Sequence, residues 1–178
     1  MTRRPIDPRI DTGRTEGTPS EEGRVSRDDF RDALAHWATG VSIVAVRDES
    51  DVQATTVGSL TSISDDPPTI AVSLTASARI LPFLTQDVRF GVSVLEASQA
   101  RIASVFADSY PVGPSPFGDD EIPLVENAVV GLACRVTQIT AVSGSYLVIG
   151  MVEHVTHGPE RDPLVYYRRQ YQGLDTLE

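Results

Sequence analysis

The double proline at Pro67 and Pro68 constrains the fold most, because it places a turn inside an otherwise extended segment. Proline fixes its own φ angle and keeps the residue before it out of the helical region. Residues 65–68 therefore predict a turn, and the apolar run at 69–74 predicts a strand after it. The segment before the turn is crowded with hydroxyl groups, six within ten positions: Thr55, Thr56, Ser59, Thr61, Ser62 and Ser64.

A phosphate site is predicted directly after this strand. Ser77 can cap a helix that opens with Arg79. The free N–H groups of a helix N-terminus, together with a hydroxyl and a guanidinium group, favour the binding of phosphate. The hydroxyl-rich segment before the turn offers donors and acceptors to a flat polar ring. Residues 54–79 thus predict a site for a phosphorylated ring compound.

The rest of the chain is patterned mainly as strands. Ser26 and Asp29 predict a capping box, and Phe30, Leu34 and Trp37 follow at helical spacing, so we expect a helix that ends at Gly40 and packs on the sheet through Trp37. Alternating apolar residues and β-branched composition predict further strands. Residues that favour helices predict a second helix, and a segment rich in Pro, Gly and Asp predicts a long loop. The strands are expected at 41–46, 90–95, 129–141, 146–155 and 163–167, the helix at 96–107 and the loop at 108–123.

Length and composition predict a single folded domain. The chain has 178 residues, of which 40% are hydrophobic, and this suits one core. Residues 1–25 are polar and charged, so we expect a disordered tail, with a partner-docking arm as the alternative, followed by the domain at 26–178. No apolar run of about 18 residues is present, so we expect no membrane span. The single cysteine, Cys134, suits a reducing compartment, so we expect a cytoplasmic protein.

Several classes of function are disfavoured by the same sequence. The net charge of −10 argues against nucleic-acid binding, which needs clustered basic residues. His154 and His157 are three apart and point to opposite faces of a strand, so no metal site is expected. Cys134 falls on an apolar face of its strand, which indicates a small buried side chain rather than a nucleophile. No dinucleotide fingerprint or glycine-rich phosphate loop occurs.

The central segment resembles the flavin reductase-like family. The pattern T-x-x-S-x-x-S-x-S-x-D-P-P, an apolar strand and S-x-R carry the resemblance, which extends over about residues 30–174. The matching positions are Thr56, Ser59, Ser62, Ser64, Asp66, Pro67, Pro68, Ser77 and Arg79. The resemblance implies a mainly β fold, an FMN-binding split β-barrel of Greek-key type with a few flanking helices. It also implies an NAD(P)H:flavin oxidoreductase that binds FMN or FAD, supplies reduced flavin to a partner monooxygenase and forms a homodimer.

The same resemblance assigns site residues. The ring and ribityl chain of the flavin would lie against the segment before the turn, the phosphate against Ser77 and Arg79, and Phe106 and Ala107 beside the cofactor. The residues before the turn are Thr56, Val57, Ser59, Leu60, Thr61 and Ser62.

One position departs from the family pattern. Many reductases of the family have Gly-Asp-His where this chain has Ser143-Gly144-Ser145, and their histidine is placed near the nicotinamide. Ser145 and the following Tyr146 are therefore the candidate catalytic positions, with Tyr146 stacking in place of the histidine. The alternative is a barrel that no longer uses NAD(P)H and serves as a flavin-binding carrier or as a non-redox biosynthetic enzyme such as a cyclase.

Overall fold

The computed structural model describes residues 25–49, 51–108 and 113–174. The predicted tail at 1–25 lies, except for Val25, outside these residues. The chain divides into two compact units, Met1–Leu34 and Ala35–Glu178. In the first unit the described structure is helix α1 (Arg27–Leu34), which has no buried residue. One half of the predicted capping box is confirmed, because Asp29 donates its backbone N–H to Ser26 Oγ at 3.0 Å. The Asp29 side chain is joined to the Ser26 side chain, with Ser26 Oγ donating to Asp29 Oδ2 at 2.7 Å.

The predicted end of this helix at Gly40 is wrong. The helix ends at Leu34, and Gly40 belongs to strand β1 (Thr39–Gly40), whose residues pair with Tyr166 and Val165. Because of this pairing, the backbone of Thr39 and Gly40 is extended and part of a sheet rather than the end of a helix. The expectation that Trp37 packs on the sheet is also wrong, since its side chain is 70% exposed.

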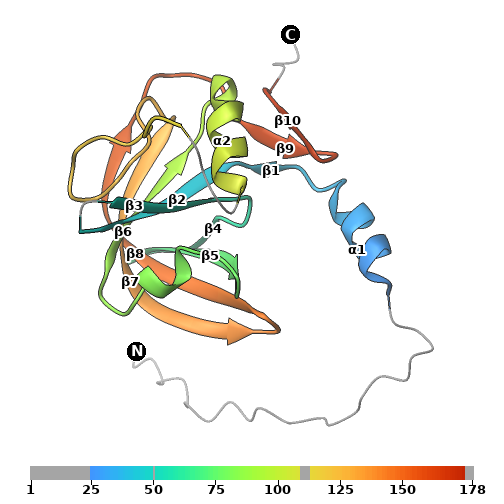
Figure 1. Ribbon diagram of the computed structural model, residues 1–178, viewed down its shortest axis with the longest axis horizontal. Helices are drawn as coiled ribbons and strands as arrows, with labels where there is room; N and C mark the ends of the chain where they lie inside the picture. The colour runs from blue at the N-terminus through green and yellow to red at the C-terminus, as the bar shows by residue number, and fades with distance from the viewer. Residues whose placement is uncertain (1–24, 50, 109–112, 175–178) are drawn as a thin grey trace, which may run out of the picture. The chain divides into compact units, whose positions relative to one another are not determined.

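The second unit is mostly β structure in two antiparallel sheets (Figure 1). The larger sheet has seven strands in the order β3-β2-β6-β7-β8-β5-β4, so β3 and β4 are its edges. Its strands are β2 (Ser42–Asp48), β3 (Asp51–Val57), β4 (Thr61–Asp65), β5 (Pro68–Thr75), β6 (Arg89–Val94), β7 (Val130–Val142) and β8 (Ser145–His157). The smaller sheet has the order β1-β9-β10, with β9 (Val165–Tyr167) and β10 (Gln170–Gln172).

Two tight turns set the register of the larger sheet. The expected turn is present: Asp66 and Pro67 connect β4 to β5, Pro68 is the first residue of β5, and the peptide bond between Asp66 and Pro67 is cis. Ser143 and Gly144 connect β7 to β8 with φ angles of 47° and 82°. Positive φ at both central residues is the geometry of the two-residue turn that matches strand twist. The resulting β7–β8 hairpin is the long orange arm in Figure 1.

Short helices follow β5 and β6. A 3₁₀ turn, η1 (Leu81–Phe83), lies between β5 and β6, and a second, η2 (Ala97–Gln99), leads directly into α2 (Ala100–Ala107). The predicted helix at 96–107 is therefore confirmed apart from its first turn. None of the helices in the described ranges is long and apolar enough to cross a lipid bilayer.

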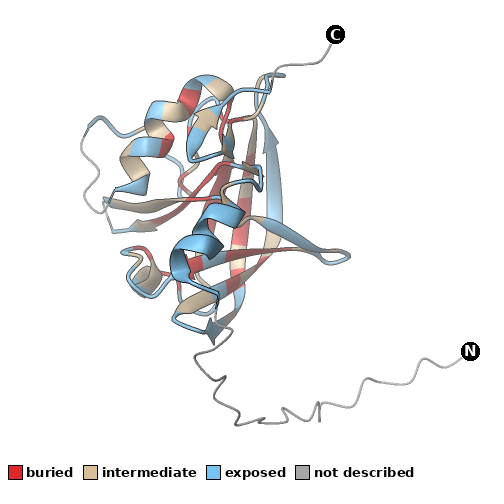
Figure 2. Cartoon of the chain, turned by 90° about the vertical axis from the view of Figure 1, so that its right-hand side faces the viewer, coloured by how far each residue is buried: buried red, intermediate tan, exposed pale blue. Residues whose placement is uncertain are grey.

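The two faces of the sheet pack into different clusters, and β2 takes part in both. Val44 and Val46 contribute to one cluster, and Ile43 and Ala45 to the other, because successive side chains of a strand point to opposite faces. Figure 2 shows buried positions along many of the strands. The first cluster draws on β2, β3 and β5 to β8, and the second lies against α2 and contains Ala103, Phe117 and Leu164.

Cys134 lies inside the first cluster with no exposed surface. Burial, and next the charge of Glu153, raise the pKa of its thiol to about 12. The expectation of a small buried side chain is confirmed.

Candidate functional site

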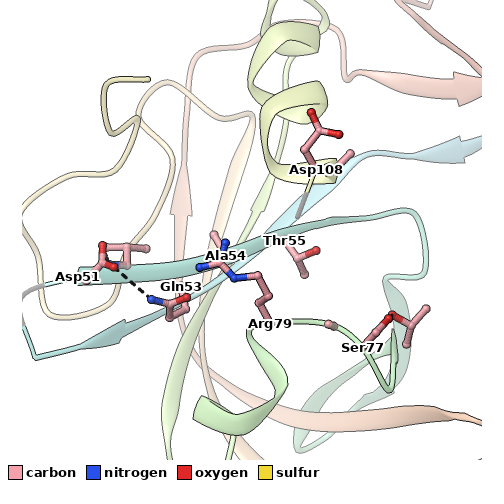
Figure 3. A pocket seen from close by; sticks show the side chains of 11 residues that line it. Asp51, Gln53, Ala54, Thr55, Ser77, Arg79 and Asp108 are labelled. Carbon is pink, nitrogen blue, oxygen red and sulfur yellow. Dashed lines mark hydrogen bonds between the residues drawn. The ribbon is translucent and has the colours of Figure 1, made fainter. Parts of the chain in front are cut away.

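A cavity of about 500 Å³ opens between edge strand β3 and the segment that follows β5. Residues 51–55 of β3 form one wall, and residues 75 and 77–79 form the facing wall. The rim is completed by the C-terminal end of α2 at Ala107 and Asp108. Figure 3 shows the Arg79 side chain reaching across this space toward β3.

Ser77 and Arg79, the two predicted phosphate ligands, both line this cavity. However, the helix that Ser77 was expected to cap is absent. The next helical element, η1, starts after Ile80 with no side-chain cap and has a proline in its first turn. The hydroxyl of Ser77 instead lies 3.3 Å from that of Thr75. Any anion here would meet side-chain donors rather than the N-terminus of a helix.

Two of the hydroxyls predicted to contact a ring are hydrogen-bonded to the protein backbone instead. Thr56 Oγ1 donates to the carbonyl oxygen of Ala103 at 2.7 Å, which ties β3 to α2. Ser59 Oγ donates to the carbonyl oxygen of Ser73 and accepts from its N–H, both at 3.0 Å, which ties the β3–β4 link to β5. These two hydroxyls satisfy backbone groups.

The four other predicted ring contacts occupy two environments. Val57 is buried in the first cluster and Leu60 packs against it, whereas Thr61 and Ser62 are exposed on edge strand β4. None of the six predicted ring-contact residues is among the described residues that line the cavity.

The predicted catalytic positions lie at the start of β8, next to the cavity wall. Ser145 pairs with Thr75, which lines the cavity, and Tyr146 pairs with Leu74. The N–H of Ala76 donates to the carbonyl oxygen of Gly144 at 3.2 Å. The β7–β8 turn is therefore held against the segment that carries Ser77 and Arg79.

The last turn of α2 contributes to more than one cavity. Ala107 lines the main cavity, whereas Phe106 lines a second cavity of about 370 Å³ together with Arg47 and Phe117. The rings of Phe106 and Phe117 meet edge to face, with centroids 5.4 Å apart and an interplanar angle of 65°. The structure thus places the two predicted cofactor neighbours on different sides of the helix end.

Sequence reasoning missed one wall of the main cavity. Asp51, Gln53 and Thr55 alternate along β3 and all line it. Gln53 Nε2 donates to Asp51 Oδ2 at 3.2 Å, drawn as the dashed line in Figure 3. The period-two spacing of polar residues on this strand was the available signal. Among the described lining residues, Arg79 is the sole base and Asp51 and Asp108 are the acids.

Comparison with known proteins points to one family. The model of the flavin reductase like domain matches residues 34–175. The chain is 33% identical over 145 residues to the reductase component of 4-hydroxyphenylacetate 3-monooxygenase from Thermus thermophilus, covering 82% of this chain and 95% of that protein. It is 35% identical over 152 residues to an NADH-dependent flavin reductase from Pseudomonas fluorescens, covering 81% and 88% respectively.

A solved structure gives the same result. The styrene monooxygenase flavin reductase from Pseudomonas putida S12 superposes with a TM-score of 0.76 at 34% identity. The match covers 84% of this chain and 99% of that one.

Proposed function

Because this chain belongs to the flavin reductase like domain family, we propose that it is an NADH-dependent flavin reductase. It would supply reduced FMN or FAD to a partner monooxygenase, as the names of its relatives indicate for those proteins. The observation that carries the proposal is the convergence of Ser77 and Arg79 on one cavity, directly after the strand that follows the double proline.

The cavity provides what a flavin phosphate needs. The guanidinium group of Arg79 offers several N–H donors in a fork, which suits phosphate oxygens. The hydroxyls of Ser77 and Thr75 add further donors. The flavin itself supplies the hydride chemistry when it is bound, so the protein has to hold and orient it.

We place the flavin ring at the edge of β3. This strand ends the sheet, and an edge strand presents a row of backbone N–H and C=O groups. Those groups suit the donors and acceptors of the pyrimidine edge of the ring. They would replace the hydroxyls of Thr56 and Ser59, which are engaged with the backbone of Ala103 and Ser73.

The nicotinamide is proposed to approach from the β7–β8 turn. Ser145 lies there in register with Thr75 of the cavity wall. Hydride transfer from a reduced nicotinamide to a flavin depends on stacking and distance, so a serine in place of the family's histidine is compatible with the reaction. Ser145→His is expected to raise the rate of NADH oxidation if an imidazole improves nicotinamide binding.

The proposal extends to the architecture and assembly of the family, a split β-barrel that forms homodimers. The first core cluster supports barrel-like curvature, because it gathers residues from strands near both ends of the seven-stranded sheet. Exposed apolar residues such as Ile63 and Val142 support a subunit contact. Sedimentation at micromolar concentration tests the dimer, and a monomer would contradict it.

The decisive experiment measures NADH oxidation with FMN, FAD or riboflavin as acceptor. Wild-type protein should oxidise NADH at a rate that rises with flavin concentration. Arg79→Ala should raise the KM for FMN at least tenfold while changing that for riboflavin far less, because riboflavin has no phosphate. The matched control is Arg101→Ala, which removes an exposed guanidinium group of α2 away from this cavity.

Two outcomes would contradict the proposal. One is the absence of turnover with any flavin and either pyridine nucleotide. The other is an equal loss with FMN and riboflavin in Arg79→Ala, which would mean that Arg79 does not bind the phosphate. Yellow protein that is inert to NADH would instead indicate a flavin carrier.

A further inference from the structure

Three elements of the fold form the main cavity, and α2 is the one that lies outside the large sheet. One wall is β3, and the facing wall is the end of β5 with the segment after it. Ala107 and Asp108 at the end of α2 complete the rim. Figure 3 shows Asp108 at this helix end, next to β3. The position of the rim therefore depends on how α2 is held against the sheet.

Side-chain hydrogen bonds hold α2 at its start and at its middle. At its start, Gln99 Nε2 donates to the carbonyl oxygen of Glu126 at 2.8 Å, in the loop before β7. At its middle, Thr56 Oγ1 donates to the carbonyl oxygen of Ala103 at 2.7 Å. Thr56 belongs to edge strand β3, so this second bond connects the helix to the strand that forms a wall of the cavity.

The acceptor of the Thr56 bond belongs to the last turn of α2. Ala103 lies four residues before Ala107, so its carbonyl is the acceptor that regular α-helical geometry gives to the N–H of Ala107. A backbone carbonyl has two lone pairs and can accept from both donors. The hydroxyl of Thr56 therefore holds the turn that carries Ala107 to the rim.

The side chain of Thr56 lies on the face of β3 that meets α2. Val52 and Ala54 pack against the second core cluster, which also contains Ala103. Thr56 is two residues further along the same face, because alternate side chains of a strand share a face. Its neighbour Thr55 lines the cavity, whereas Thr56 is not among the described residues that do so.

We propose that Thr56 is a positioning residue, which fixes the α2 rim of the cavity and thereby strengthens flavin binding. The inference rests on the proposed function for the identity of the ligand. Without this hydrogen bond the last turn of α2 moves more freely, and a bound ligand has to restrict it again at a cost in free energy. Thr56 thus acts through α2, in contrast to the contact with the flavin ring that the family resemblance implies.

Hydrogen exchange of the flavin-free protein tests the role of this bond directly. Thr56→Val keeps the shape of the side chain but removes the donor, so the amides of residues 104–107 should exchange roughly three- to tenfold faster, the effect of one hydrogen bond. Strand β7 should keep its wild-type exchange, which would show that the sheet is intact. Thr56→Ser, which restores a hydroxyl, should restore slow exchange.

Ser104→Ala is the matched control. Ser104 Oγ donates to the carbonyl oxygen of Ala100 at 3.0 Å, so this change also removes a hydroxyl bonded to a carbonyl of α2, but one that comes from the helix itself. It should not speed exchange. Thr56→Ala, which removes the same hydroxyl as Thr56→Val without a branched side chain, should give the same result as Thr56→Val and replaces it if that variant folds poorly.

FMN binding is then measured with the same variants by fluorescence titration. Thr56→Val should weaken binding by roughly threefold or more, in line with the loss of one hydrogen bond. The kcat for NADH oxidation at saturating FMN should stay close to that of the wild type, because Thr56 touches no reacting group. Thr56→Ser and Ser104→Ala should bind FMN as the wild type does.

The two measurements together decide the proposal. Weaker FMN binding with unchanged exchange would overturn it, because Thr56 would then bond to the flavin itself. Faster exchange with unchanged FMN binding would also overturn it, because the position of α2 would then not matter to the ligand. If the wild type reduces FMN with NADH and Thr56→Val matches it in both measurements, this inference fails and the proposed function stands. If the wild type neither binds nor reduces any flavin, the proposed function fails, and exchange alone decides whether Thr56 holds α2.

Discussion

At the scale of single residues, Gly150 of β8 packs closely against the first core cluster. A Cβ atom there would lie 2.6 Å from Cζ of Phe90, a ring with no exposed surface. Cys134 Cβ would be 3.4 Å away. We therefore expect Gly150→Ala to lower the free energy of unfolding by about 1–3 kcal/mol, the usual cost of overpacking, in urea denaturation.

Gly40 provides the matched control for that substitution. A Cβ atom there would meet nothing within 4 Å, so Gly40→Ala should change stability by no more than about 0.5 kcal/mol. Equal stabilities of Gly150→Ala and the wild type would mean that Phe90 can move aside.

At the scale of elements, hydrogen bonds from two arginines connect the loop between α2 and β7 to the sheet. Arg47 of β2 donates to the carbonyl oxygens of Asp120 at 3.0 Å and Gly118 at 2.9 Å, and Arg89 of β6 donates to Glu121 at 3.1 Å. Arg47→Met should lower the free energy of unfolding by about 1–2 kcal/mol, because a charged donor to two carbonyl groups is lost. It should also speed proteolytic cleavage near residues 118–121.

Arg101→Met is the control for the loop, since Arg101 lies exposed on α2. It should leave both stability and cleavage unchanged. If Arg47→Met is cleaved at the wild-type rate, the remaining contacts, such as that between Arg89 and Glu121, are sufficient to hold the loop.

The elements also show what could be predicted from the sequence. The β7–β8 hairpin was predictable because alternation on both sides and a Ser-Gly pair leave few other folds for those residues. The helix expected at Arg79 failed because a hydroxyl before an apolar run also fits a turn, and Pro82 limits the helical structure to the single turn η1. The end of α1 was missed because Thr39 and Gly40 pair with a strand more than 120 residues later, which local pattern cannot reveal.

Some residues of the candidate site could be predicted from the sequence, and others could not. Ser77 and Arg79 were found because they follow a turn that proline makes recognisable. Gln53 and Asp51 were missed because their role depends on which strand forms the edge of the sheet. The backbone bonds of Thr56 and Ser59 depend on α2 and β5, so a count of hydroxyls could not separate binding groups from structural ones.

At the scale of the whole molecule, an ion network joins β6, β7 and β8. Glu153 accepts from Arg135 at 2.6 Å and from Arg89 at 2.9 Å. Arg135, more than Arg89, holds the pKa of Glu153 below its ordinary value of 4.5. A carboxylate whose pKa is lowered by folding stabilises the protein above its unfolded pKa and loses that contribution as the pH falls through the folded value.

The network therefore predicts a pH-dependent effect. Glu153→Gln should lower the Tm at pH 7, and the difference from wild type should shrink as the pH falls below 4.5. Glu160→Gln, at an exposed position, should have the wild-type Tm throughout. A difference in Tm that persists undiminished in acid would assign the effect of Glu153 to packing rather than charge.

The burial of Cys134 makes the native protein convenient for site-directed labelling. With a thiol pKa of about 12 and no exposed surface, Cys134 presents almost no thiolate to a maleimide dye near neutral pH. It is the one cysteine of the chain, so a second cysteine introduced at an exposed position would take up the dye selectively. A fluorophore could thus be attached beside the cavity without first replacing the native thiol.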